Sequence, residues 1–480
     1  MLAIAIERDS QQPIYRQIED QIREAIRDQR LRPMDRLPTI RELAGQLQVA
    51  RITVSAAYDD LIAEGYLTAR VGFGTQVVRD LPVRPPSASD VSPETLPPVG
   101  GLRTRRTNDT IDLRPRGLGM DLFPTKLWGK LVARAWSDIG REGAVDDESS
   151  RGDPYLRAVL ARRVGLTRGI RAKPSDVFVL TGVTAICDVV ARAFLQKSGV
   201  CVLEDPGCMS FVGALKTHEG RLVPAIVDEH GLIPEGLPEA ADMLLVSSSW
   251  TFPQGGSMPM RRRRAVLSWA REAGAVIYEH DWAGTVRFHG GPLPAIQSLD
   301  VSARAIYAAG FHEIIPAVRV GFAIVPAALR EQLEGSLTPL DVMPSAIEQR
   351  ALAYFVADGH LDRHLRRLRV ALAARRQQLA SAIESNIPSV TPLMLGEAGM
   401  QLRLHMPRGS GIDVAALVAK AREHELEVSS LSAYGLGIPT TDDGIIIDYS
   451  SASEITLMRG ARRLSAAWRD LIDGSSRRSA

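Results

Sequence analysis

The sequence predicts a multidomain protein with an N-terminal winged helix-turn-helix, a larger α/β domain and a smaller C-terminal α+β subdomain. Three observations predict this architecture: helical periodicity followed by a hairpin pattern near the N-terminus, a proline-rich stretch after it, and short apolar strands alternating with helices beyond. We place the boundaries at residues 1–80 for the first domain, 81–107 for a linker, 108–345 for the large domain and 346–480 for the small subdomain.

The first domain contains three helical patterns and a hairpin pattern. Four isoleucines spaced four residues apart place one apolar stripe on a helix over residues 13–29. Thr39 and Glu42 have the spacing of a capping box at the start of a second helix. A third helix begins at Arg51, and glycines in residues 66–78 favour two short strands joined by a tight turn. These elements in this order indicate a winged helix-turn-helix.

Such a domain reads DNA by placing its recognition helix in the major groove, with first-turn residues at base edges and arginines on phosphates. Arg51 and Thr53 hold the first turn here. The expected DNA-contacting residues are Arg36, Thr39, Arg41, Arg51, Thr53, Arg70 and Gly72. Because residues 1–80 hold 11 Arg against 12 Asp plus Glu, a charge-balanced protein-interaction module is the alternative.

Nearly all of residues 11–79 carry a family resemblance. The segments PIYRQIEDQIREAI, RLPTIRELAGQLQVARITVSAAYDDLIAEGYL and RVGFGTQVV resemble the DNA-binding domain of GntR-family bacterial regulators. The resemblance implies a double-stranded operator with paired half-sites and a homodimer that binds it. Ala50 departs from the family, which usually has a serine there as the cap of the recognition helix.

The composition sets limits on location and on partners. Six prolines in residues 81–101 indicate a semi-extended linker. The net charge of +2 gives no global attraction to nucleic acid or membrane. No window approaches the roughly 18 apolar residues of a spanning helix, and the three cysteines have neither metal-site nor disulfide-framework spacing. We therefore expect a cytoplasmic protein with no membrane partner.

The rest of the chain shows six short apolar strands separated by helices, which predicts a mostly parallel, doubly wound sheet with its ligand site at the carboxyl ends of the strands. The strands begin at 177 (VFVL), 200 (VCVLE), 243 (MLLVS), 275 (AVIYE), 304 (RAIYAA) and 321 (GFAIVP). GMQLRL, LEVSS and GIIIDYS, lying among helices, predict the α+β subdomain.

Several segments in order resemble the fold type I, pyridoxal-phosphate-dependent aminotransferases. They are LFPTKLW, RGDPYLRAVLARRV, LTGVTA, LEDPGC, SWTFPQGG, IYEHDWAGTVRF and HEIIPAVRVGFAIVP. Together with the first domain, the chain is similar to the MocR subfamily of GntR regulators. That resemblance implies an aminotransferase-like domain that senses an effector rather than acting as an enzyme.

The cofactor residues of those enzymes are replaced. His312 stands where the family has its Schiff-base lysine, and no lysine lies between 217 and 419. His280 replaces the acid that keeps the pyridine nitrogen protonated, although a one-residue slip would let Asp281 serve. Trp282 replaces a tyrosine, and Trp250 replaces a histidine.

Two anion-binding features of the cofactor site remain. They are Arg319 and the Thr181-Gly182-Val183 turn at a helix N-terminus. No arginine lies between 441 and 450 to hold a substrate carboxylate. We therefore predict no catalytic residues, no resident metal and no covalent pyridoxal phosphate.

The expected pocket comprises Thr181, Gly182, Val183, Trp250, His280, Asp281, Trp282, His312 and Arg319. Three interpretations of it stay open: a collapsed site, a repurposed site for an aromatic or planar anionic ligand, and a metal site formed by His280, Asp281 and His312, whose spacing matches no known motif. The leading functional interpretation is a dimeric DNA-binding regulator with a possible small-molecule effector. The alternatives are an aminotransferase-like enzyme with an altered site and a purely structural dimerisation scaffold.

Overall fold

The computed structural model of this protein describes most of the chain. The described residues are 4–8, 10, 12–70, 74–79, 109–142, 151–281, 284–291, 293–316, 318–337, 340, 342–387, 393–394, 396–407, 412–437 and 442–476. The chain forms two units, Met1–Arg106 and Thr107–Ala480, and each is described by itself. The predicted linker at 81–107 lies outside the described residues. Within the described ranges, no helix is both long and apolar enough to span a bilayer.

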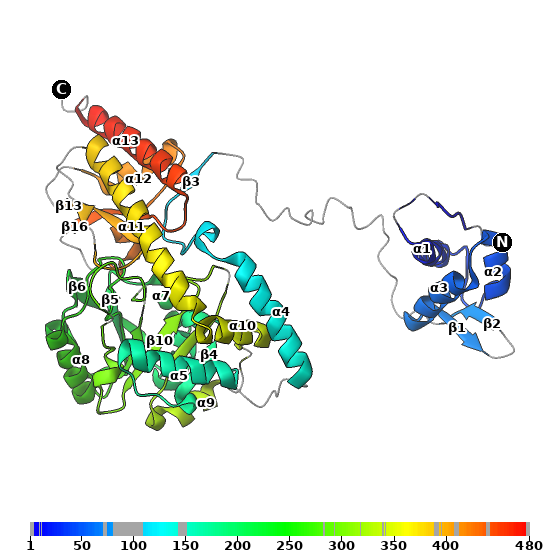
Figure 1. Ribbon diagram of the computed structural model, residues 1–480, viewed down its shortest axis with the longest axis horizontal. Coiled ribbons are helices and arrows are strands. Elements are labelled where there is room, and N and C mark those ends of the chain that lie inside the picture. The colour runs from blue at the N-terminus through cyan, green and yellow to red at the C-terminus, as the bar shows by residue number, and fades with distance from the viewer. Residues whose placement is uncertain are drawn as a thin grey trace. The chain divides into compact units, whose positions relative to one another are not determined.

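The first unit is the predicted winged helix-turn-helix (Figure 1). Its elements are α1 (Ile14–Arg27), α2 (Ile40–Leu47), α3 (Arg51–Ala63), β1 (Leu67–Arg70) and β2 (Gly74–Val77). The two strands pair antiparallel, with Leu67 opposite Val77. The apolar stripe of α1 is fully buried at Ile18 and Ile22 and packs with Val54 and Leu61 of α3.

The second unit is built on an eight-stranded sheet in the order β4-β11-β10-β9-β8-β5-β6-β7. The strands are β4 (Val177–Leu180), β5 (Val200–Asp205), β6 (Arg221–Asp228), β7 (Gly231–Leu232), β8 (Met243–Val246), β9 (Val276–His280), β10 (Ala305–Gly310) and β11 (Gly321–Ile324). Strands β6, β5, β8, β9 and β10 are parallel, whereas β11 is antiparallel to both of its neighbours. All six predicted strands are confirmed.

The sequence analysis missed β6 and β7, which lie at one edge of the sheet. Strand β6 contains Pro224 and has an exposed Ile226, so its pattern does not alternate as a half-buried strand should. Strand β7 has only two residues. The proline within β6 and the short length of β7 therefore hide both strands from prediction by apolar pattern.

Helices cover both faces of the sheet. On one face α6 (Gly182–Phe194), α7 (Met209–Lys216) and α9 (Arg330–Leu337) contribute to a common apolar cluster. The opposite face packs against α8 (Met260–Ala273) and α5 (Pro154–Arg168). The sheet is thus doubly wound, as predicted.

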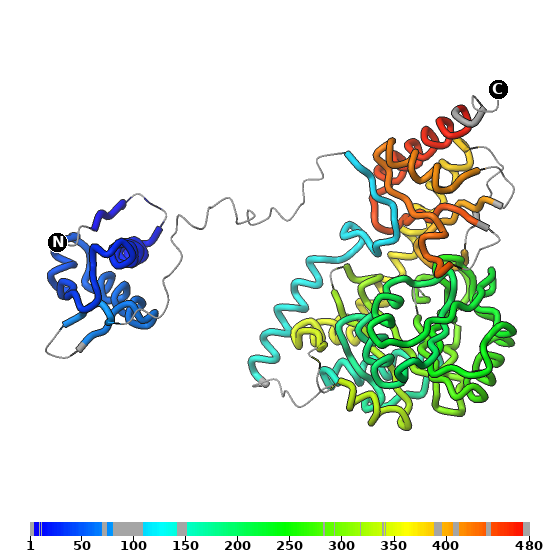
Figure 2. The backbone as a smooth tube through the Cα atoms, turned by 180° about the vertical axis from the view of Figure 1, so that it is seen from behind, coloured from blue at the N-terminus to red at the C-terminus, as the bar shows by residue number. Residues whose placement is uncertain are grey.

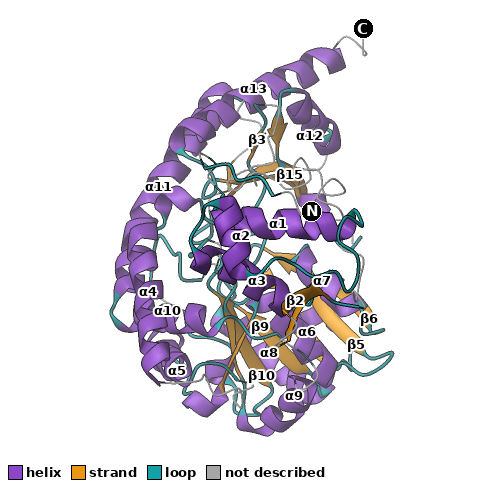
Figure 3. Cartoon of the chain, turned by 90° about the vertical axis from the view of Figure 1, so that its right-hand side faces the viewer, coloured by secondary structure: helices purple, strands orange, loops and turns teal. Residues whose placement is uncertain are grey.

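The C-terminal subdomain is α+β, as predicted. Its four-stranded sheet has the order β12 (Leu393–Met394), β13 (Gln401–Pro407), β16 (Asp442–Asp448) and β15 (Ser429–Ser430). The helices are α11 (His360–Asn386), α12 (Val414–Glu423) and α13 (Glu454–Ser476), and α11 packs against α13 (Figure 3). Strand β3 (Ile111–Asp112) pairs with β14 (Leu426–Glu427), so the first strand of this unit lies beside its C-terminal part (Figure 2).

Helix α10 (Ala346–Ala357) follows the boundary that the sequence analysis placed at 345, yet it packs against the large domain. It contacts α4 (Thr125–Glu142), where the Tyr354 hydroxyl donates to Asp138 at 2.7 Å, and the Gln349 side chain accepts from the Asp153 amide at the start of α5. The helix therefore belongs with the large domain, because its buried face fills the space between α4 and α5.

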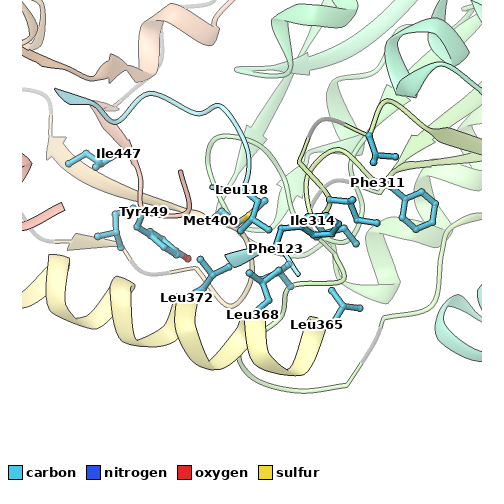
Figure 4. Close-up of a cluster of buried hydrophobic side chains, with 14 of the residues drawn as sticks. Leu118, Phe123, Phe311, Ile314, Leu365, Leu368, Leu372, Met400, Ile447 and Tyr449 are labelled. Atoms are coloured by element: carbon cyan, nitrogen blue, oxygen red, sulfur yellow. The ribbon is translucent and has the colours of Figure 1, made fainter. Parts of the chain in front are cut away.

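One apolar cluster joins the large domain to the small subdomain along α11. Figure 4 shows Leu365, Leu368 and Leu372 of α11 beside Phe123, Ile314 and Met400. Leu372 and Met400 are fully buried. The two parts of the second unit therefore share a core.

Candidate functional site

The turn between α2 and α3 forms the DNA-reading element of the first unit. Thr39 caps α2: its hydroxyl oxygen accepts from the Glu42 amide at 3.2 Å, and the Glu42 carboxylate accepts from the Thr39 amide at 2.9 Å. Gln48 ends α2 in the left-handed conformation. The predicted capping box is confirmed, so Thr39 has a structural role in addition to the DNA contact expected of it.

A hydrogen bond fixes helix α3 to the rest of the domain, whereas the first turn of the helix has no side-chain cap. The Tyr58 hydroxyl donates to the Pro38 carbonyl at 2.9 Å, which ties α3 to the segment before α2. Ala50 occupies the N-cap of α3 and makes no side-chain cap hydrogen bond, as expected from its sequence. The first turn of α3 is therefore positioned by packing instead of by a cap.

The structure exposes most of the expected DNA contacts. Arg36, Arg41 and Arg51 are exposed, and Thr53 is half-buried in the first turn of α3. Arg70 ends β1 on the wing, but its side chain and the whole of Gly72 lie outside the described residues.

Sequence reasoning missed Ile52, which is 78% exposed beside Arg51 in the first turn of α3. An exposed apolar side chain at this place can contact a thymine methyl group in the major groove. The sequence does show Ile52 as a large apolar residue that does not belong to the buried stripe of α3.

In the second unit, the expected anion turn lies where β4 meets α6. Gly182 has a φ of +83°, and a Cβ at Gly321 would lie 3.0 Å from the Val183 nitrogen. The glycine at the start of β11 therefore lets the N-terminus of α6 approach the sheet edge. The Thr181 hydroxyl donates to the Val342 carbonyl at 2.8 Å and so holds a neighbouring segment.

His280 and His312 meet at this edge. A Cβ at Gly310 would touch both the His312 ring, 2.9 Å from Nδ1, and the Val183 side chain, so these groups surround the end of β10. Burial lowers the pKa of His280 to about 3, and the nearby His312 adds to that effect. Burial and the charge of the exposed Arg319 lower the pKa of His312 to about 4. Both imidazoles are therefore neutral near pH 7.

A small hollow lies next to His280. Its volume is about 20 Å³, and Glu204, Cys208, Phe211 and Ser247 are among its lining residues. The ring of Phe211 packs edge-on against His280, with centroids 4.9 Å apart. This space holds about one water molecule.

Glu204 is a buried carboxyl group that the sequence analysis did not single out. One of its oxygens accepts from the Ser247 amide at 3.0 Å, and the other, Oε1, has no hydrogen-bond partner among the described residues. Burial raises the pKa of Glu204 to about 8. The available signal was an acidic residue at the carboxyl end of a fully apolar strand.

Asp281 faces away from this hollow. Its Oδ2 accepts from Arg168 Nε and from the Tyr307 hydroxyl, both at 2.5 Å, on the opposite side of the sheet from Phe211. Asp281, the residue after β9, therefore does not take the place of His280, because successive residues at the end of an extended strand face opposite sides. Among the described residues, no group of three or more His, Cys, Asp or Glu side chains could hold a metal ion.

Trp250 contacts residues of the small subdomain. It packs with Phe252, Ala398 and Tyr434, and the backbone of Gly399 lies directly against its indole. Trp250, which we expected to form an apolar wall of the pocket, packs between the large domain and the small subdomain. Trp282 lies outside the described residues.

The residues present at the sheet edge do not fit a covalently bound pyridoxal phosphate. The group needs an amine and a ring acid, whereas the ends of β10 and β9 present His312 and His280. Five of the six lysines are exposed, and the half-buried Lys420 pairs with Glu423 at 2.6 Å. None of the six lines the hollow.

Known proteins that are similar to this chain extend over both of its units. The GntR family, described as "Bacterial regulatory proteins, gntR family", matches residues 14–77. The "HTH-type pyridoxine biosynthesis transcriptional regulator PdxR" of Corynebacterium glutamicum is 30% identical over 465 residues, which cover 95% of this chain and 96% of that protein. The chain belongs to the MocR-type branch of the GntR family. The "Probable rhizopine catabolism regulatory protein MocR" of Rhizobium meliloti is 29% identical, covering 97% of this chain and 96% of that protein.

The fold of the second unit is also found in enzymes of known structure. A kynurenine aminotransferase of Pyrococcus horikoshii superposes with a TM-score of 0.68 at 22% identity, covering 76% of this chain and 92% of that one. The MocR-type chain is thus a DNA-binding transcriptional regulator with an aminotransferase-like second unit. The structural likeness concerns the fold alone.

Proposed function

We propose that the second unit of this MocR-type regulator is a dimerisation and effector-sensing module that forms no covalent link to pyridoxal phosphate and performs no transamination. The observation that carries the proposal is His312 at the end of β10, where the enzymes that the sequence resembles have a lysine. An imidazole forms no stable Schiff base, and His280, with a pKa lowered by burial to about 3, cannot act as the acidic partner of a pyridine nitrogen.

Two further features support a non-enzymatic role. Asp281, the acid that a one-residue slip would put in place of His280, is already bound by Arg168 and Tyr307. The chain has no arginine between 441 and 450 for a substrate carboxylate.

The experiment is borohydride reduction of the full-length protein incubated with pyridoxal phosphate, followed by intact mass and peptide mapping. We expect only scattered, substoichiometric labelling of the six lysines. A Lys216→Arg variant serves as a control, because Lys216 in α7 is an exposed lysine and its removal should delete one minor label only. A single stoichiometric adduct on one lysine would contradict the proposal and revive the enzyme interpretation.

Effector sensing is separated from a purely structural role by thermal unfolding in the presence of candidate metabolites. A ligand that binds only the folded state raises the unfolding temperature as its concentration rises. If a broad metabolite panel gives no such shift, the scaffold interpretation is favoured over sensing.

A further inference from the structure

A second cavity lies in the second unit, apart from the hollow beside His280. It has a volume of about 210 Å³ and is bounded by the C-terminal end of α5, the loop 284–291 and the first turns of α11. Five arginines line it: Arg163, Arg168, Arg287, Arg366 and Arg369. Asp362 is the one acidic residue among the described lining residues.

The ion pairs leave this cavity with an excess of positive charge. Arg163 pairs with Asp362 at 3.0 Å, Arg168 with Asp281 at 2.5 Å and Arg287 with Glu397 at 2.7 Å. The other two arginines have no carboxylate partner among the described residues. Arg369 donates to the Thr285 carbonyl at 2.9 Å, and Arg366 is exposed at the rim.

Three of the arginines that line the cavity have a buried guanidinium nitrogen without an acceptor among the described residues. Arg168 is 3% exposed, yet its Nη2 has no hydrogen-bond partner among the described residues. The same holds for the Nε atoms of Arg287 and Arg369. Buried polar groups are nearly always hydrogen-bonded, so several unmatched donors around one cavity indicate that an acceptor-rich ligand belongs there.

The backbone is shaped to bring the loop close to Arg168. A Cβ added at Gly284 would lie 2.8 Å from Arg168 Nη2, so only glycine allows the chain to pass at this distance. The buried arginine is in turn held by Asp281 and so cannot swing away. Arg168 is therefore fixed in place before any ligand arrives.

We propose that this cavity binds a small anionic metabolite that carries phosphate or carboxylate groups. Guanidinium groups bind both kinds of group through paired, charge-assisted hydrogen bonds. The volume suits a small molecule and excludes a nucleic acid strand. This site is separate from the former cofactor site, because Asp281 and Arg168 lie on the opposite side of the sheet from His280 and Phe211. The inference concerns binding and does not depend on whether the ligand alters DNA affinity.

The test is calorimetric titration of the full-length protein with pyrophosphate and with citrate, at an ionic strength held constant with sodium chloride. The variants are Arg366→Gln and Arg369→Gln. The matched control is Arg367→Gln, which removes the same charge from the neighbouring exposed residue of α11 that does not line the cavity.

We expect one site per chain for at least one probe, an affinity loss of about tenfold in each cavity variant, and a change of less than about twofold in the control. Should Arg369→Gln fail to fold, Arg366→Gln decides the matter, because Arg366 is exposed and makes no hydrogen bond among the described residues. The proposal is overturned if neither probe binds, or if Arg366→Gln binds as the control does. It is equally overturned if Arg367→Gln loses as much affinity as the cavity variants, since general surface charge would then explain the binding.

Discussion

Arg168 and Asp281 form a buried ion pair, with 2.5 Å between Nε and Oδ2 and both side chains 3% exposed. The pair joins the end of α5 to the end of β9, and the Tyr307 hydroxyl donates to the same carboxylate oxygen. Burial alone would raise the pKa of Asp281, but the Arg168 charge and the hydrogen bonds lower it instead. The carboxylate is therefore a fixed structural anion and not a spare acid for chemistry.

Breaking this pair should destabilise the second unit strongly. Arg168→Met leaves a buried, uncompensated carboxylate, for which we expect a loss of about 3 to 5 kcal/mol in the free energy of unfolding. Urea unfolding followed by circular dichroism measures it. Arg271→Met, which removes an exposed pair with Glu272, is the control and should cost less than about 1 kcal/mol. Equal unfolding midpoints for both variants would show that the buried pair contributes no more to stability than the exposed pair does.

The DNA contacts should separate into base reading and backbone binding. Arg51→Ala should reduce sequence preference by about 1 to 3 kcal/mol, whereas Arg36→Ala should weaken binding to all sequences alike and flatten its salt dependence. Binding to operator and scrambled duplexes at several salt concentrations measures both effects. Equal losses on both duplexes for both variants would contradict the assignment.

Ile52 gives a separate prediction for the same helix. If its 78% exposed side chain contacts a thymine methyl group, Ile52→Ala should lower operator affinity and leave binding to a scrambled duplex unchanged. The expected loss is about 1 kcal/mol, because a few methyl groups are removed from an apolar contact. Replacing the contacted thymine by uracil should produce a similar loss in the unmodified protein and none in the variant.

Glu204 should make stability depend on pH. Burial raises its pKa to about 8 in the folded protein, from an ordinary value of 4.5. The folded state then holds the extra proton, so the stabilisation is complete below pH 4.5 and is lost as the pH rises through 8. Glu204→Gln should remove this loss and stabilise the protein at pH 8 by roughly 1 to 3 kcal/mol.

Unfolding of both proteins at several pH values between 5 and 9 measures this effect. Glu239→Gln, at an exposed position, is the control and should leave the pH profile unchanged. Parallel profiles for Glu204→Gln and the unmodified protein would show that this carboxyl does not titrate in the window.

The proposed dimer gives the last prediction. The resemblance to fold type I aminotransferases implies a homodimer, and operators usually have paired half-sites. Sedimentation of the full-length protein without DNA should therefore show a dimer. A monomer at micromolar concentration would mean that the second unit does not dimerise the protein.

Local patterns in the sequence determined much of this protein. The spacing of isoleucines, the Thr39 and Glu42 pair and the apolar strand segments predicted α1, α2 and six strands, because periodicity and capping depend on neighbours a few residues apart. The histidines at 280 and 312 were visible in the same way, as departures within recognised segments.

Only the tertiary structure decided which of these residues meet. Alternation at the end of β9 makes His280 and the next residue, Asp281, face opposite sides, but the packing of α6, α7 and α5 decides which side each residue faces. Trp250 was expected as an apolar wall of the pocket, and its indole packs on glycines nearly 150 residues later, at Gly396 and Gly399. The arginine-lined cavity gathers side chains from α5, the loop 284–291 and α11. The spacing of residues within one element cannot predict such a cluster, because the cluster depends on how distant elements pack against one another.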